Sequence, residues 1–75
     1  MRPELISMAS EILEISPSEA CENCEPVPEI DGYYIWDSSR GGLSMLVSES
    51  GERLVATSSV GFDEHLEAYL AGRRN

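Results

Sequence analysis

Residues 32–57 have the sequence GYYIWDSSRGGLSMLVSESGERLVAT, and this stretch decides the fold. It begins with an aromatic and β-branched run over 33–36, of the kind enriched in strands. Apolar and polar residues then alternate over 43–48, which is typical of a half-buried strand. A glycine-bearing loop over 49–52 leads to a return strand over 53–57. The pattern predicts a three-stranded antiparallel meander.

The predicted hairpin pairs Val47 with Leu54 and Met45 with Ala56, which places apolar side chains on one face. A slip of one residue would separate these side chains, so the hydrophobic pattern should determine the pairing. A sheet of this kind buries one face under helices and leaves the other face open.

The aromatic strand cannot point all its side chains inward, because successive side chains face opposite ways. Tyr33 and Ile35 share one face, and Tyr34 and Trp36 share the other. We expect one pair in the core and the other over the open face, where Tyr and Trp are residue types that anchor interfaces. Simple aromatic packing under a terminal segment is the alternative.

The residues before the meander predict two helical segments. A first helix over 3–15 presents an apolar face, and a short turn over 17–23 follows, with Ser16 as N-cap and Glu19 reaching back to it. The alternating prolines that follow, over 25–29, should keep the chain extended and unpaired.

A last helix over 62–71 is predicted after the meander. Its expected apolar stripe consists of Phe62, Leu66, Tyr69 and Leu70, and Gly72 should end it. His65 on this helix is interpreted as a surface or capping histidine.

These elements predict one small α+β domain over 1–75, with the C-terminal helix packed on one sheet face. The domain divides into a helix over 1–15, a connection with the cysteines and prolines over 16–31, the β-meander over 32–58 and a helix over 61–72.

The chain is strongly acidic, with 14 acids, five arginines, no lysine and a net charge of −9. Residues 1–31 hold eight of the acids and one arginine, which sum to −7. Such a surface repels nucleic acid and anionic membranes and attracts a basic partner. No apolar run reaches the ~20 residues of a membrane span, and the N-terminus lacks the plan of a signal peptide, so we expect a cytoplasmic protein.

Cys21 and Cys24 form a C-x-x-C motif, which has three interpretations. Zinc would need further ligands, and the chain offers His65, a carboxylate or a second chain to supply them. A redox role expects a βαβ context that is absent here, and nearby glutamates disfavour a thiolate. We interpret the pair as reduced thiols, with no cofactor, and keep zinc as the alternative.

Short motifs in the second half of the chain resemble a known family. They are the runs over 32–42, 46–47, 51–52, 56–60 and 64–70. These runs are similar to the small bacterial immunity proteins of the YrhB-like family. The resemblance covers residues 30–72 and implies a helix, a three-strand meander and a closing helix in a protein that binds and blocks a cognate toxin.

Together these observations predict a binding and inhibitory protein and not an enzyme. The expected partner is a protein with a basic surface, such as a toxin or a nucleic-acid-binding enzyme, which the acidic surface would attract. The candidate partner-binding residues are Glu4, Glu11, Glu14, Glu22, Glu25, Glu29, Tyr34 and Trp36. The alternatives are a zinc-dependent structural or regulatory module using Cys21 and Cys24, and an accessory subunit of a larger complex. A homodimer also stays open.

Overall fold

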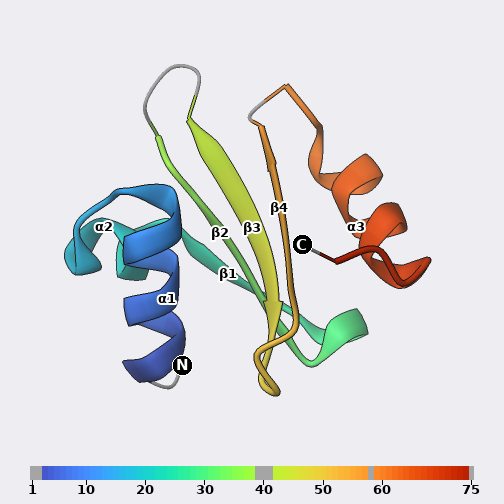
Figure 1. Ribbon diagram of the computed structural model, residues 1–75, viewed down its shortest axis with the longest axis horizontal. Helices are drawn as coiled ribbons and strands as arrows, with labels where there is room; N and C mark the ends of the chain where they lie inside the picture. Colours follow the sequence, from blue (N-terminus) through green and yellow to red (C-terminus); the bar gives the residue numbers. More distant parts are fainter. Residues whose placement is uncertain (1–2, 39–41, 58, 75) are drawn as a thin grey trace.

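A computed structural model describes residues 3–38, 42–57 and 59–74 of the chain (Figure 1). The start of the predicted 1–15 helix and the end of the predicted 32–58 meander lie outside the described residues. The elements follow one another as α1 (Pro3–Leu13), α2 (Pro17–Glu22), β1 (Cys24–Val27), the 3-10 helix η1 (Pro28–Ile30), β2 (Gly32–Trp36), β3 (Leu43–Ser48), β4 (Arg53–Thr57) and α3 (Phe62–Leu70).

The α+β class is confirmed, but the sheet has four antiparallel strands in the order β1-β2-β3-β4 instead of three. The additional strand is β1, which contains Pro26 opposite Tyr33 of β2. The prediction that the prolines keep this segment unpaired is therefore wrong. An edge strand tolerates proline, because one side of its backbone needs no hydrogen-bonded neighbour.

The predicted pairing of β3 with β4 is wrong by one residue. Met45 lies opposite Val55, and Val47 lies opposite Arg53. The backbone N–H of Ser48 donates to the carbonyl oxygen of Glu52 at 2.9 Å, which closes a three-residue loop in which Gly51 has φ 95°. That positive φ is typical of this loop length. The prediction failed because β3 is buried on both faces, so apolar side chains on one face could not determine the pairing.

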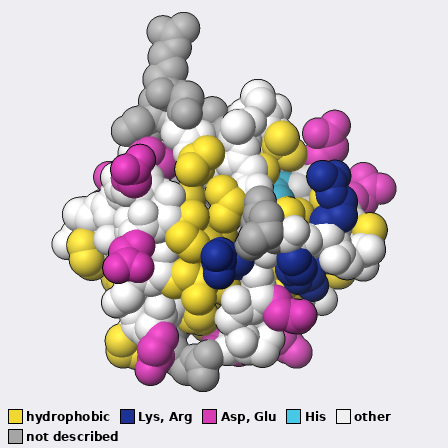
Figure 2. Space-filling view, in the orientation of Figure 1, with side chains coloured by type: hydrophobic (Ala, Val, Ile, Leu, Met, Phe, Trp, Pro, Cys, Tyr) yellow, Lys and Arg dark blue, Asp and Glu magenta, His cyan; other side chains and the backbone are white. Residues whose placement is uncertain are grey.

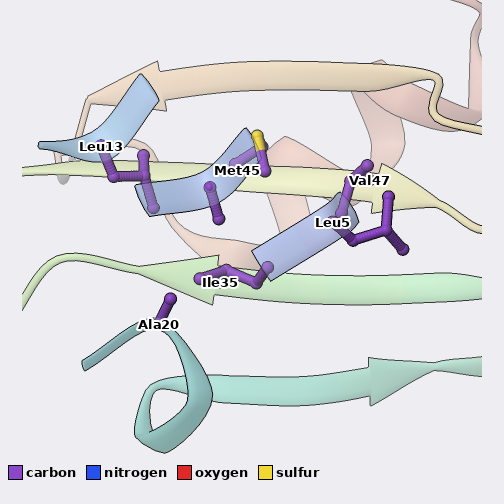
Figure 3. Packing of buried hydrophobic residues seen from close by; sticks show 7 residues of the cluster. Leu5, Leu13, Ala20, Ile35, Met45 and Val47 are labelled. Carbon is purple, nitrogen blue, oxygen red and sulfur yellow. The ribbon is translucent and has the colours of Figure 1, made fainter. Parts of the chain in front are cut away.

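Both faces of the sheet carry helices, so the expected open face is not observed (Figure 1). The helices α1 and α2 lie on one side and α3 on the other. A buried aliphatic cluster, which we call the α1-side core, fills the first interface (Figure 3). It consists of Leu5, Ala9, Leu13, Ala20, Ile35, Met45 and Val47.

Two local hydrogen-bond motifs shape the turn between α1 and α2. α1 ends at Leu13, two residues before the predicted end, because Glu14 has φ 56° and the N–H of Ile15 donates back to the Ser10 carbonyl at 3.1 Å. Ser16 caps α2 as predicted, since its Oγ accepts from the Glu19 N–H at 3.1 Å. The Glu19 carboxylate, however, accepts from the backbone N–H and Oγ of Ser38.

The apolar stripe of α3 differs from the prediction. Phe62 is 38% exposed and Leu70 is 58% exposed, whereas His65 and Tyr69 are buried. A second cluster lies under α3 and contains Val27, Leu46, Leu54 and Tyr69. The helix ends where expected, with Gly72 at φ 96°. None of the described helices is long and apolar enough to cross a membrane.

Candidate interaction surface

A groove of about 550 Å³ lies on the side of the sheet that carries α3. α3 packs chiefly against β4 and β3, and the side chains of β2 that share this face are only partly covered. We call this hollow the aromatic groove. Its lining residues are Glu25, Tyr34, Trp36, Asp37, Leu43, Ser44 and Phe62.

Tyr34 lies at the centre of the aromatic groove and contacts three other rings. Trp36 stacks on it with ring centroids 5.6 Å apart and an interplanar angle of 29°. Phe62 meets it edge to face at 4.9 Å, and His65 does so at 5.9 Å. Offset-stacked and edge-to-face arrangements are the favourable geometries for aromatic pairs. The rings are therefore held in place by one another while Tyr34 and Trp36 stay half-buried.

Carboxylates flank these rings. Glu25 on β1 lies directly opposite Tyr34 in the sheet and is exposed. Asp37 follows β2 and is half-buried, and its backbone N–H donates to the Leu43 carbonyl at 2.9 Å. The groove thus combines an apolar aromatic wall with negative charge beside it, which suits a group that is partly apolar and positively charged.

His65 is a buried structural residue beneath this groove, and the prediction of a surface or capping histidine is wrong. Its Nε2 lies 2.7 Å from the Leu54 carbonyl oxygen, and its Nδ1 lies 3.4 Å from the Ser44 Oγ. A carbonyl only accepts, so Nε2 carries the proton and Nδ1 accepts from the Ser44 hydroxyl. Burial lowers the pKa of His65, against a smaller opposing effect of the Leu54 carbonyl. The ring is therefore held neutral.

The two cysteines do not form a site with His65. Cys21 is exposed on α2, and Cys24 is half-buried on the α1 side of β1, across the sheet from His65. Burial is the main cause that raises the pKa of Cys24, which favours the protonated thiol. Within residues 3–38, 42–57 and 59–74, no group of three or more His, Cys, Asp or Glu side chains is arranged to hold a metal ion.

The structure brings together three of the eight predicted partner-binding residues. Glu25, Tyr34 and Trp36 all line the aromatic groove. The other five are exposed and lie elsewhere: Glu4, Glu11 and Glu14 on or next to α1, Glu22 on α2 and Glu29 on η1. The helices α1 and α2 cover the opposite side of the sheet, so their glutamates cannot contact a group in the groove.

Acidic and basic side chains occupy different parts of the face drawn in Figure 2. Hydrophobic side chains run down its middle, arginines lie at the centre and to the right, and acidic side chains lie around the rim. Arg53 and two glutamates of α1, Glu4 and Glu11, line a hollow beside this helix. Two glutamates of α1 thus line the same hollow as an arginine, whereas none of the described residues that line the aromatic groove is cationic.

Sequence reasoning missed Phe62 and Leu43 as parts of the groove. Phe62 was assigned to the buried stripe of α3, yet it is the first residue of that helix and 38% exposed. Its position one turn before His65 and Leu66 is consistent with either location, so helical spacing alone could not distinguish them.

Comparisons with protein-family models, curated proteins and solved structures find no match for this chain. The groove must therefore be interpreted from its own geometry.

Proposed function

We propose that this chain is a small acidic protein-binding protein that inhibits its partner, and that the aromatic groove is its main contact surface. The observation that carries the proposal is the half-buried pair Tyr34 and Trp36, which lies in a 550 Å³ groove beside the exposed ring of Phe62. Large aromatic side chains in a partly enclosed site are the residues that dominate binding energy at interfaces.

The charge of the chain favours a basic partner. A net charge of −9 attracts positively charged surfaces over a distance and raises the rate of association at low salt. An immunity protein that neutralises a cognate toxin is the specific form of this function that we propose, because the resemblance over residues 30–72 implies it and many nucleic-acid-cleaving toxins need basic substrate sites.

A capture experiment with matched variants tests this function. The protein is used as bait in lysate of the source organism, alongside Trp36→Ala and Leu70→Ala, and the beads are washed at increasing salt. We expect one basic protein to be retained by wild type and Leu70→Ala, lost with Trp36→Ala and released by salt. The activity of that protein, measured with and without the bait, then separates an inhibitor from an accessory subunit.

Equal retention by all three baits would contradict the groove as the contact surface. Circular dichroism of each bait excludes loss of fold as the reason for lost capture.

A further inference from the structure

We propose that the aromatic groove receives an arginine side chain of the partner protein. This inference rests on the proposed function and specifies the chemistry of its contact. The groove needs a group with a flat cationic end and an apolar stem, and arginine has both.

The first argument is the shape of the aromatic wall. Trp36 stacks on Tyr34 with the ring planes 29° from parallel, so the two rings form a stack of nearly parallel flat surfaces. A guanidinium is planar and stacks on such a surface, and it is attracted by the negative face of the rings. Leu43 in the lining supplies an apolar contact for the stem.

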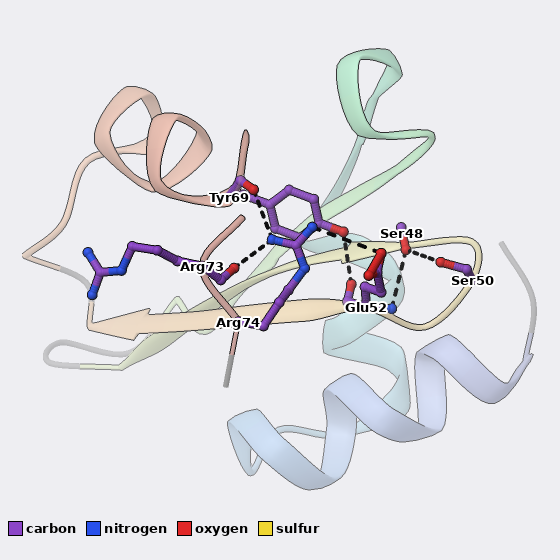
Figure 4. A network of polar contacts seen from close by, with 6 residues as sticks. All are labelled: Ser48, Ser50, Glu52, Tyr69, Arg73 and Arg74. Carbon is purple, nitrogen blue, oxygen red and sulfur yellow. Dashed lines mark hydrogen bonds and ion pairs between the residues drawn. The ribbon is translucent and has the colours of Figure 1, made fainter. Parts of the chain in front are cut away.

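The second argument is an arrangement of the same kind within the protein itself (Figure 4). The guanidinium carbon of Arg74 lies 3.7 Å from the centroid of the Tyr69 ring. The Glu52 carboxylate lies 4.0 Å from the same guanidinium. The guanidinium also donates to the backbone carbonyls of Tyr69 and Arg73, so one ring, one carboxylate and two carbonyls surround it at the end of α3.

Among the residues that the structure describes, the lining of the aromatic groove contains a tyrosine ring and a carboxylate, as this set does, but no cation. Tyr34 corresponds to Tyr69, and the exposed Glu25, its neighbour across the strand pair, corresponds to Glu52. Within the described part of the chain, the N-terminus of α3 adds positive potential beside Phe62, and the exposed carboxylates of Asp63 and Glu64 in its first turn offset it.

The test uses Trp36 as a reporter, because it is the single tryptophan of the chain. Three glycine–serine peptides carry two Leu-Arg pairs, two Leu-Lys pairs or two Leu-citrulline pairs. Each is titrated into the full chain while Trp36 fluorescence is recorded. We expect saturable binding of the arginine peptide, binding of the lysine peptide about two- to fivefold weaker, and no saturation with the uncharged citrulline peptide.

Two pairs of matched variants locate the binding. Glu25→Gln should weaken the arginine peptide about two- to fivefold, whereas Glu11→Gln, which changes the net charge equally on the other side of the sheet, should not. Phe62→Ala should weaken binding, because it removes one wall of the groove, whereas Leu70→Ala on the same helix should not.

Three results would overturn the inference: citrulline binding as tightly as arginine, Glu11→Gln weakening binding as much as Glu25→Gln, or no fluorescence change with any peptide. If the peptides fail while Trp36→Ala still abolishes capture of the partner, the arginine inference is wrong and the proposed function stands. If the arginine peptide binds as expected while capture is insensitive to Trp36→Ala, the groove binds arginine and the proposed function is wrong for this surface.

Discussion

The two faces of the sheet both bury aliphatic side chains but differ in the other residues that they carry. The α1-side core consists of aliphatic residues, and Leu5, Ile35 and Met45 in it are at most 1% exposed. The α3 side buries polar groups, His65 and Ser44, and leaves aromatic rings partly open. A closed aliphatic interface stabilises the fold, whereas a face with oriented polar groups and accessible rings can also bind a partner. Both sides therefore stabilise the fold, and the α3 side in addition leaves the rings of the aromatic groove accessible.

The largest expected effect concerns the α1-side core. Leu5→Ala removes a fully buried side chain from the α1-side core and should destabilise the protein by about 2–5 kcal/mol. The total stability of a domain of this size is about 3–5 kcal/mol, so the variant should lose a large part of it. Urea denaturation followed by circular dichroism measures this change. Leu70→Ala, at an exposed leucine of α3, is the control and should change stability by less than about 0.5 kcal/mol. Similar losses in both variants would contradict the role of the buried Leu5 side chain in stabilising the protein.

The next effect concerns the buried histidine of the α3 side. His65→Gln disturbs two buried hydrogen bonds, to the Leu54 carbonyl and the Ser44 hydroxyl, and should cost about 1–3 kcal/mol at neutral pH. Burial holds the pKa of His65 below its ordinary value of 6.5. As the pH falls below 6.5, the unfolded chain therefore binds a proton at His65 that the folded chain excludes. The stability that the neutral His65 contributes is thus fully present above pH 6.5 and is lost as the pH falls below this value.

The pH dependence separates this histidine from the many carboxylates of the chain. Denaturation of wild type and His65→Gln at about pH 7.5 and at about pH 5.5 should show a smaller difference at the lower pH, since only wild type carries the titrating ring. A difference that stays constant, or grows, as the pH falls would contradict a histidine held neutral by burial.

A smaller effect returns to the α1 side. Ser16→Ala removes the Oγ that accepts from the Glu19 N–H, and should cost about 1 kcal/mol. Ala20 of α2 belongs to the α1-side core, so loss of the Ser16 cap should lower the free energy of unfolding of the whole domain. Urea denaturation measures this change. Ser18→Ala, at an exposed position within the same helix, is the matched control and should stay within about 0.5 kcal/mol of wild type. Equal costs would show that the cap contributes nothing.

Local patterns predicted most of the elements of this fold. The Ser16 cap and the Gly72 end of α3 are defined by residues near one another in sequence, and they were predicted correctly. The strand β1 was missed because the tolerance of Pro26 depends on its place at the edge of the sheet. That place is a property of the whole sheet, and local preferences do not contain it.

The pairing of β3 and β4 and the position of His65 were missed for a related reason. Alternation identifies the two faces of a strand, but it does not say whether one or both are covered. Tyr34 and Trp36 were correctly placed on one face, whereas the contribution of Phe62 required knowing that α3 lies on that same side. Contacts between elements distant in sequence thus account for both errors.

The smallest effect concerns the arginine that already lies on a ring. The contact between Glu52 and Arg74 joins two partly exposed side chains at 4.0 Å, so Glu52→Gln should change stability by no more than about 0.5 kcal/mol. Tyr69→Phe instead removes a hydroxyl that donates to the Glu52 carbonyl at 3.0 Å, and should cost about 0.5–1.5 kcal/mol. Urea denaturation of both variants measures the two changes in stability. If Glu52→Gln costs more than Tyr69→Phe, the exposed ion pair stabilises the protein more than the hydrogen bond of the Tyr69 hydroxyl does, and the expected order of these two effects is wrong.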